Sequence, residues 1–276
     1  MRAHILIPWY SGDLGRVPWV GALVRELARQ AKDVCGGSYM IHLHVNGVHC
    51  KSTLTALMKY LTAEIPLVTS AVPFADKRAA IRYGAEVALD SHSEILVVVD
   101  NDIVIPGGAL ESLVAAFRTS ASGAACATKA PLTGFWSPPF QLLYSYAVQQ
   151  SFHHDLFPKR GTGSFYAVDP AIVHSVMPYS EIGDTAILAR IGATLSSVVV
   201  QSPYAENIDA EIDRRARHWL ASSRNGYFRF HADPNFADDA MTIKIPNSVD
   251  GSRFRNSIRL WRRVHEEAAA RAASRK

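Results

Sequence analysis

The alternation of strand-like and helix-like segments in the first 118 residues is the feature that most constrains the fold of this chain. Four apolar runs of strand length are each followed by a stretch with helical periodicity. These runs occupy residues 4–10, 39–47, 66–72 and 94–99. Strands that alternate with helices form a parallel sheet with helices on both faces, and such sheets bind ligands at the carboxyl ends of their strands. The sequence therefore predicts an α/β fold with a mostly parallel central sheet.

The pattern becomes less regular after residue 119. Residues 123–132 and 193–203 are expected to be further strands, and residues 208–224 a helix. Residues 133–163 are rich in aromatic side chains, Pro and polar residues. This composition is typical of a loop that covers a binding site, and we expect one there.

Two carboxylates, Asp100 and Asp102, follow the apolar run Ile95–Val99 and are separated only by Asn101. Like charges this close raise the pKa of one carboxyl unless a cation is present. Mg²⁺ or Mn²⁺ would remove the conflict, since both prefer oxygen ligands and are commonly bound together with substrate phosphates. The pattern suggests a metal–diphosphate site, although a polar turn with two solvated acids fits the same three residues.

The segment that leads to these acids resembles a known family. The stretch "KRAAIRYGAEVALDSHSEILVVVDND" is similar to the family 2 nucleotide-sugar glycosyltransferases of the GT-A fold, a Rossmann-like fold. In that family a helix with the spacing K-x-x-A-x-N-x-G precedes a strand that ends in Asp-x-Asp. Lys77, Ala80 and Gly84 match this spacing, and Arg82 stands where Asn is usual.

A second stretch, "IGDTAILARIGATL", resembles the downstream Gly-Glu-Asp motif of the family and the short helix that follows it. Asp184, Arg190 and Gly192 match the family's Asp, Arg and Gly, and Gly183 replaces its Glu. The resemblance covers residues 3 to about 200 and depends on the order and spacing of the motifs together.

The resemblance implies a metal site at the two acids. Asp102 would bind the Mg²⁺ or Mn²⁺ that bridges the two phosphates of a nucleoside-diphosphate sugar. Asp100 would hold the ribose or share the metal, with Asn101 beside the donor. His218 is a further candidate for contact with the metal or the diphosphate, and a hydrogen-bonded, partly buried imidazole is the alternative for it.

The resemblance also implies a donor site around these residues. The end of the first strand, with Pro8 and Tyr10, would border the nucleobase. Asn46 lies where the family often has an Asp that reads the base. Lys77 would lie near the base or the phosphates, and a surface lysine in a first helical turn is the alternative. Gly163 would lie below the donor sugar, or it belongs to a tight turn into a strand.

Asp184 would be the general base. In an inverting transfer a carboxylate takes the proton of the acceptor hydroxyl as that hydroxyl attacks the anomeric carbon. An Asp before "TAILAR" is also a good helix cap, and the two roles are compatible.

The predicted function is therefore a metal-dependent, inverting glycosyltransferase. It would move a sugar from a nucleoside-diphosphate sugar to the hydroxyl of a saccharide, lipid-linked or natural-product acceptor. A retaining transferase on the same fold, a sugar nucleotidyltransferase and a non-catalytic binding module are the alternatives. The nucleotidyltransferases need a Gly-rich loop after the first strand, and "PWYSGDLGR" contains only two Gly.

The net charge of +4 is concentrated at the C-terminus. From Arg253 onward there are eight Lys and Arg against two Glu, whereas the rest of the chain is slightly acidic, which argues against nucleic acid as a partner. We expect one GT-A domain over residues 1–250 and a basic amphipathic helix over residues 251–276. That helix would pack on the domain or lie on an anionic membrane surface as a peripheral contact.

The cellular compartment is predicted from the cysteines and from the absence of targeting signals. Cys35, Cys50 and Cys126 form no C-x-x-C pair, which favours a reducing compartment. No apolar run is long enough to span a membrane and no signal peptide is visible, so we expect a cytoplasmic protein.

Overall fold

The computed structural model divides the chain into two compact units, which are described separately. The first unit holds residues 1–129, 161–180 and 187–200, and the second holds residues 130–160, 181–186 and 201–276. The structure describes residues 1–10, 14–73, 76–132, 139–154, 161–176, 187–188, 190–203, 207–223 and 244–274.

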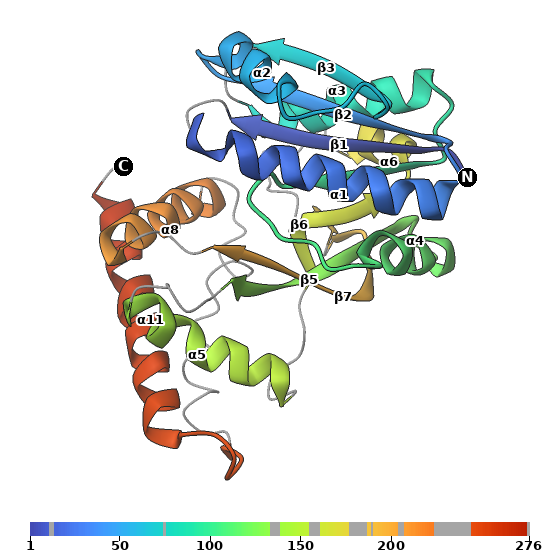
Figure 1. Cartoon of the computed structure of the whole chain (residues 1–276). Helices are drawn as coiled ribbons and strands as arrows, with labels where there is room; N and C mark the ends of the chain where they lie inside the picture. The colour runs from blue at the N-terminus through green and yellow to red at the C-terminus, as the bar shows by residue number, and fades with distance from the viewer. Residues whose placement is uncertain are drawn as a thin grey trace. The chain divides into compact units, whose positions relative to one another are not determined.

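A seven-stranded sheet in the order β3-β2-β1-β4-β6-β5-β7 organises the first unit (Figure 1). Strands β1 to β4 pair in parallel, whereas β6 is antiparallel to both β4 and β5. The strands are β1 Ala3–Tyr10, β2 Tyr39–Asn46, β3 Leu67–Val72, β4 Ile95–Val99, β5 Ala124–Leu132, β6 Gly161–Val168 and β7 Thr194–Pro203.

Helices cover both faces of this sheet. Figure 1 shows α1 and α4 in front of the sheet and α3 and α6 behind it. The helices of this unit are α1 Val17–Cys35, α2 Cys50–Met58, α3 Lys77–Asp90, α4 Ala109–Thr119 and α6 Pro170–Val176, and a short 3₁₀ turn, η1 Leu14–Arg16, precedes α1. The predicted α/β class, with a mostly parallel central sheet and a C-terminal helix, is confirmed.

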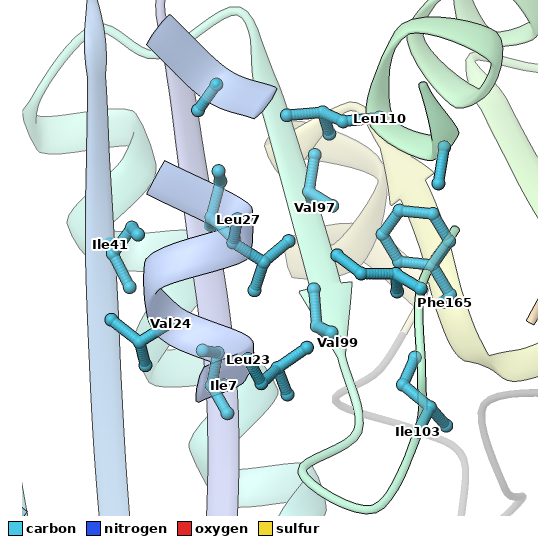
Figure 2. Close-up of a cluster of buried hydrophobic side chains, with 14 of the residues drawn as sticks. Ile7, Leu23, Val24, Leu27, Ile41, Val97, Val99, Ile103, Leu110 and Phe165 are labelled. Carbon is cyan, nitrogen blue, oxygen red and sulfur yellow. The ribbon is translucent and has the colours of Figure 1, made fainter. Parts of the chain in front are cut away.

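Strand periodicity decides which side chains meet which helix. Side chains alternate between the faces of a strand, so Ile5 and Ile7 of β1 join the core that α1 and α4 cover. Val97 and Val99 of β4 belong to the same core, as Figure 2 shows. The even-numbered positions of β1, β2 and β4 therefore face α3 on the opposite side of the sheet.

Gly84 shows how closely α3 approaches that opposite face. A Cβ atom at this position would lie 2.6 Å from Cδ2 of the fully buried Leu6. The helix can lie this close to β1 only because residue 84 has no side chain, which gives a packing reason for the Gly that matches the family spacing.

Within the described residues, the second unit has the helices α5 Pro139–His153, α8 Ile208–Ser223 and α11 Gly251–Ala273. The expectation of a loop over residues 133–163 is wrong for residues 139–153, which form helix α5. The segment has Pro at the first helical position, where its missing N–H costs nothing, and apolar residues at 140, 144 and 147. Residues 133–138 and 155–160 lie outside the described residues.

The C-terminal helix α11 packs its apolar stripe within this unit. Phe254 and Ile258 are buried against α5, and Val264 lies in a cluster with Ile212 of α8. The fully buried hydroxyl of Ser257 accepts a hydrogen bond of 3.0 Å from the Ala147 N–H of α5. Packing was one of the two interpretations of this helix, and the contacts support it.

Two further expectations concern the chain as a whole. The domain boundary expected at residue 250 does not coincide with the limits of either compact unit. Among the helices described, none is long and apolar enough to cross a bilayer. The three cysteines are buried and free.

Candidate functional site

The candidate site begins where β4 ends. Asp100 follows Val99 directly, and its backbone N–H donates a 2.8 Å hydrogen bond to the carbonyl oxygen of Ser164 in β6. Because β6 runs antiparallel to β4, with Val99 opposite Phe165, the first residues of β6 lie beside the carboxyl end of β4. The sheet topology thus adds a second group of residues to the edge at which parallel strands bind ligands.

Lys77 reaches the same point from the start of α3. The Asp76 side chain caps this helix by accepting hydrogen bonds from the N–H groups of Arg78 and Ala79, which fixes the position of the first turn. The Lys77 Nζ atom lies 2.6 Å from Oδ1 of Asp100. The carboxylate side chain is 21% exposed and the lysine side chain 39% exposed, so the pair borders solvent.

Lys129 brings a second ammonium group to this corner. It lies on β5, and its Nζ donates a 3.0 Å hydrogen bond to the Ser164 hydroxyl. Ser164 is itself 5% exposed and next to Gly163. Three strands and one helix therefore meet at Asp100, all within the first unit.

These neighbours determine the charge state of Asp100. Burial alone would raise the pKa of its carboxyl. The positive charges of Lys77 and Lys129, with hydrogen bonds from Lys77 and Ser164, outweigh burial and hold the pKa below its usual value. Asp100 is therefore ionised at neutral pH, and positive charge beside it comes from two lysines.

Asp102 has a different environment from Asp100. It is half-buried in the turn that follows β4, and within the described part of the chain it makes no hydrogen bond or ion pair. Asn101, also half-buried, separates the two acids. The two carboxylates of the Asp-Asn-Asp motif are thus not equivalent.

The side chains at the end of β4 offer few ligands for a divalent cation. The described residues contain no group of three or more His, Cys, Asp or Glu that could hold a metal ion by themselves. Mg²⁺ does not need such a cage, because it is often bound by one or two carboxylates, substrate phosphates and water. Asp102 fits this kind of site, whereas the carboxylate of Asp100 is engaged by Lys77.

The other predicted donor-binding residues lie on strands that end at the same edge. Tyr10 and Asn46 are partners in the parallel pairing of β1 and β2. Tyr10 is 59% exposed and able to meet a ligand, whereas Asn46 is 4% exposed. Pro8 is buried within β1, and Gly163 is buried in β6. Contact of these residues with a nucleobase or a sugar stays a prediction.

Two predicted residues cannot be placed in this site. Asp184, the predicted general base, lies outside the described residues. The backbone of His218 belongs to α8, but its side chain lies outside what the structure describes. Helix α8 belongs to the second unit.

Sequence reasoning missed Lys129 and Ser164. A weak signal for Lys129 exists in "GAACATKAPL", where it is the only charged residue of an otherwise apolar strand. Nothing local marks Ser164, since its position depends on the pairing of β6 with β4 and β5.

Comparisons of the sequence with family models and with curated proteins do not identify a family for this chain. No family model matches the chain, and no curated protein matches it.

Three solved structures show weak similarity to this one. TarS residues 1–349 from S. aureus has a TM-score of 0.47 at 13% identity, covering 96% of this chain and 90% of that chain. A CMP:2-keto-3-deoxy-manno-octonic acid synthetase complexed with CTP has a TM-score of 0.47 at 12% identity, covering 81% and 100%. A mannose-1-phosphate geranyltransferase from Thermus thermophilus has a TM-score of 0.42 at 13% identity, covering 74% of each chain. Similarities of this size do not establish a family.

Proposed function

We propose that this chain is a nucleotide-sugar-dependent glycosyltransferase of the GT-A type, which transfers a sugar to an acceptor hydroxyl with inversion. The observation that carries the proposal is the group of charged side chains at the carboxyl end of β4. Asp100 and Lys77 form an ion pair there, Lys129 adds a second cation, and Asp102 follows two residues later. Acids and lysines at this edge of a parallel sheet suit a diphosphate and its divalent cation.

Each group has a role in the proposed reaction. A nucleoside-diphosphate sugar would place its diphosphate over the end of β4, with the base towards Tyr10 and Asn46. Asp102 would hold Mg²⁺ or Mn²⁺ against the phosphates. The metal would stabilise the negative charge that develops on the departing nucleoside diphosphate.

Asp184 completes the proposed mechanism. Its carboxylate would take the proton of the acceptor hydroxyl while the hydroxyl oxygen attacks the anomeric carbon and the bond to the diphosphate breaks. This role rests on the resemblance of "IGDTAILARIGATL" to the family motif. We propose a cytoplasmic location and a saccharide, lipid-linked or natural-product acceptor.

A thermal-shift screen tests the donor. UDP, GDP, CDP and ADP and their common sugar conjugates would each be added with and without Mn²⁺. A ligand at 100 times its Kd stabilises the folded state by about 2.7 kcal/mol, which raises the melting temperature by several degrees. Asp102→Asn is expected to lose the Mn²⁺-dependent part of the shift.

The same screen has informative controls. Asp184→Asn is expected to keep the donor-dependent shift and to lose hydrolysis or transfer of the sugar. Product NMR reports the anomeric configuration and separates inversion from retention. The proposal fails if no nucleotide changes the melting temperature, and release of pyrophosphate would indicate a nucleotidyltransferase instead.

A further inference from the structure

We propose that Asp100 is a positioning residue for lysines that bind the donor diphosphate, rather than a metal ligand, and that Lys129 is one of these donor-binding residues. The inference rests on the proposed function and assigns different tasks to the two acids of the Asp-Asn-Asp motif. Asp102 alone would bind the divalent cation.

The geometry of Asp100 carries the first step of the inference. Its Oδ1 atom lies 2.6 Å from Lys77 Nζ, a distance typical of a strong charge-assisted hydrogen bond. Its backbone is fixed by the hydrogen bond to the Ser164 carbonyl. An anion held at a fixed place restricts the flexible lysine stem, so the ammonium group stays at the strand end instead of sampling solvent.

Ser164 carries the second step. The serine is held on both sides of its strand, because β6 pairs with β4 and with β5. Its buried hydroxyl accepts the hydrogen bond from Lys129 Nζ, and its carbonyl oxygen accepts the one from the Asp100 N–H. One residue thus fixes both Asp100 and Lys129, and the two lysines converge on one point from different elements.

The charge balance carries the third step. Two carboxylates with one divalent cation would form a neutral site with little attraction for a doubly negative diphosphate. Two lysines neutralise the two acids before any metal is bound. A bound divalent cation then leaves two net positive charges, which match the diphosphate. Without metal the lysines cancel the repulsion between the two acids and the diphosphate, so that hydrogen bonds from the two ammonium groups are expected to hold the nucleotide even in the absence of metal.

Calorimetric titration with nucleotides tests the different roles proposed for the two acids and the two lysines. The probe is whichever of UDP, GDP, CDP or ADP binds the wild-type chain, measured once with EDTA and once with Mn²⁺. Lys129→Met and Lys77→Met are each expected to weaken binding about tenfold in both conditions, as for the loss of one charged hydrogen bond. Lys32→Met is the matched control, because Lys32 is exposed in the last turn of α1, which leads to the start of β2.

Substitutions of the two acids are expected to affect nucleotide binding in different ways in this assay. Asp100→Asn should weaken binding in EDTA but keep the gain in affinity that Mn²⁺ gives. Asp102→Asn should keep binding in EDTA and lose that gain. Lys129→Arg retains the cation and should restore binding. If Lys129→Met does not fold, Ser164→Ala removes the anchor of the same lysine and replaces it in the test.

The outcomes distinguish this inference from the proposed function. If the wild-type chain binds no nucleotide, the proposed function fails and this inference fails with it. If it binds one and Lys129→Met behaves like Lys32→Met, only the inference is wrong. Equal loss of the Mn²⁺ effect in Asp100→Asn and Asp102→Asn would also overturn it.

Discussion

At the scale of single residues, the two acids after β4 show what a sequence can and cannot reveal. Their presence at a strand end predicts a divalent cation, which stays a prediction, and the structure places the ammonium group of Lys77 against Asp100. The second cation, Lys129, was not predicted, because it reaches the site through pairing of β5 with β6. That pairing joins segments more than 30 residues apart, so no short hairpin turn connects them.

Gly84 yields a prediction about stability. Gly84→Ala is expected to lower the free energy of unfolding by about 1–2 kcal/mol, because the new methyl group would overlap the buried Leu6 side chain. The overlap itself is expected to cost about 2–3 kcal/mol, of which the better helix propensity of Ala recovers about 1 kcal/mol. Urea denaturation measures the change. Gly107→Ala is the control, since a Cβ there meets nothing within 4 Å, and an equal effect in both variants would contradict the packing argument.

Three buried histidines form a hydrogen-bonded chain on the α3 face of the sheet. His4 Nε2 lies 3.2 Å from His42 Nδ1, and the hydroxyl of Ser70 lies 2.8 Å from His42 Nε2 and 2.7 Å from His44 Nδ1. Burial lowers the pKa of His4 to about 4 and that of His42 to about 3, and it also lowers the pKa of His44. Repulsion from His4 and His44 adds to the effect at His42.

These three buried histidines predict that the free energy of unfolding falls in acid. The unfolded imidazoles take up protons below pH 6.5 while the folded ones stay neutral, so stability is complete above pH 6.5 and falls towards pH 4. His4 and His42 each contribute about 1.4 kcal/mol per pH unit in that window. Urea denaturation between pH 8 and pH 5 measures the slope. His4→Leu should reduce this slope, whereas the control His49→Gln, at an exposed site, should leave it unchanged. If the free energy of unfolding of the wild-type protein does not change with pH, the buried histidines do not cause acid sensitivity.

At the scale of elements, helix α5 is the clearest difference between sequence and structure. Its aromatic and polar residues gave only a weak helical pattern, and its neighbouring segments are rich in Pro and Gly. The helix is stabilised by contacts with residues more than 60 positions later, in α8 and α11. Such contacts are absent from any local window of sequence.

Helix α11 should therefore be essential to its unit. Phe254 is fully buried next to Ala147, and Phe254→Ala is expected to cost about 3–5 kcal/mol. Thermal denaturation measures the loss. Arg255→Ala, one residue away and exposed, should change the melting temperature little. Equal melting temperatures for both variants would mean that α11 is only loosely attached and that the membrane alternative regains weight.

At the scale of the whole molecule, the sequence predicted the first half of the sheet better than the second. Residues 4–99 follow a regular alternation of strand and helix, and this alternation predicts parallel pairing of β1 to β4. Beyond residue 119 the pairing becomes antiparallel, because β6 runs opposite to β4 and β5 and inserts between them. That insertion is set by packing across the sheet, which hydrophobic periodicity does not encode.

The pairing of Thr128 with Gly161 has a consequence for how such a chain can change. Residues 130–160 form an insertion that leaves the first unit after Lys129, and the chain re-enters that unit at Gly161. The Thr128–Gly161 pair therefore closes the base of this insertion. Sequence changes between these two strands that keep the buried contacts of α5 with α8 and α11 are therefore expected to leave the neighbourhood of Lys129 and Ser164 unaltered.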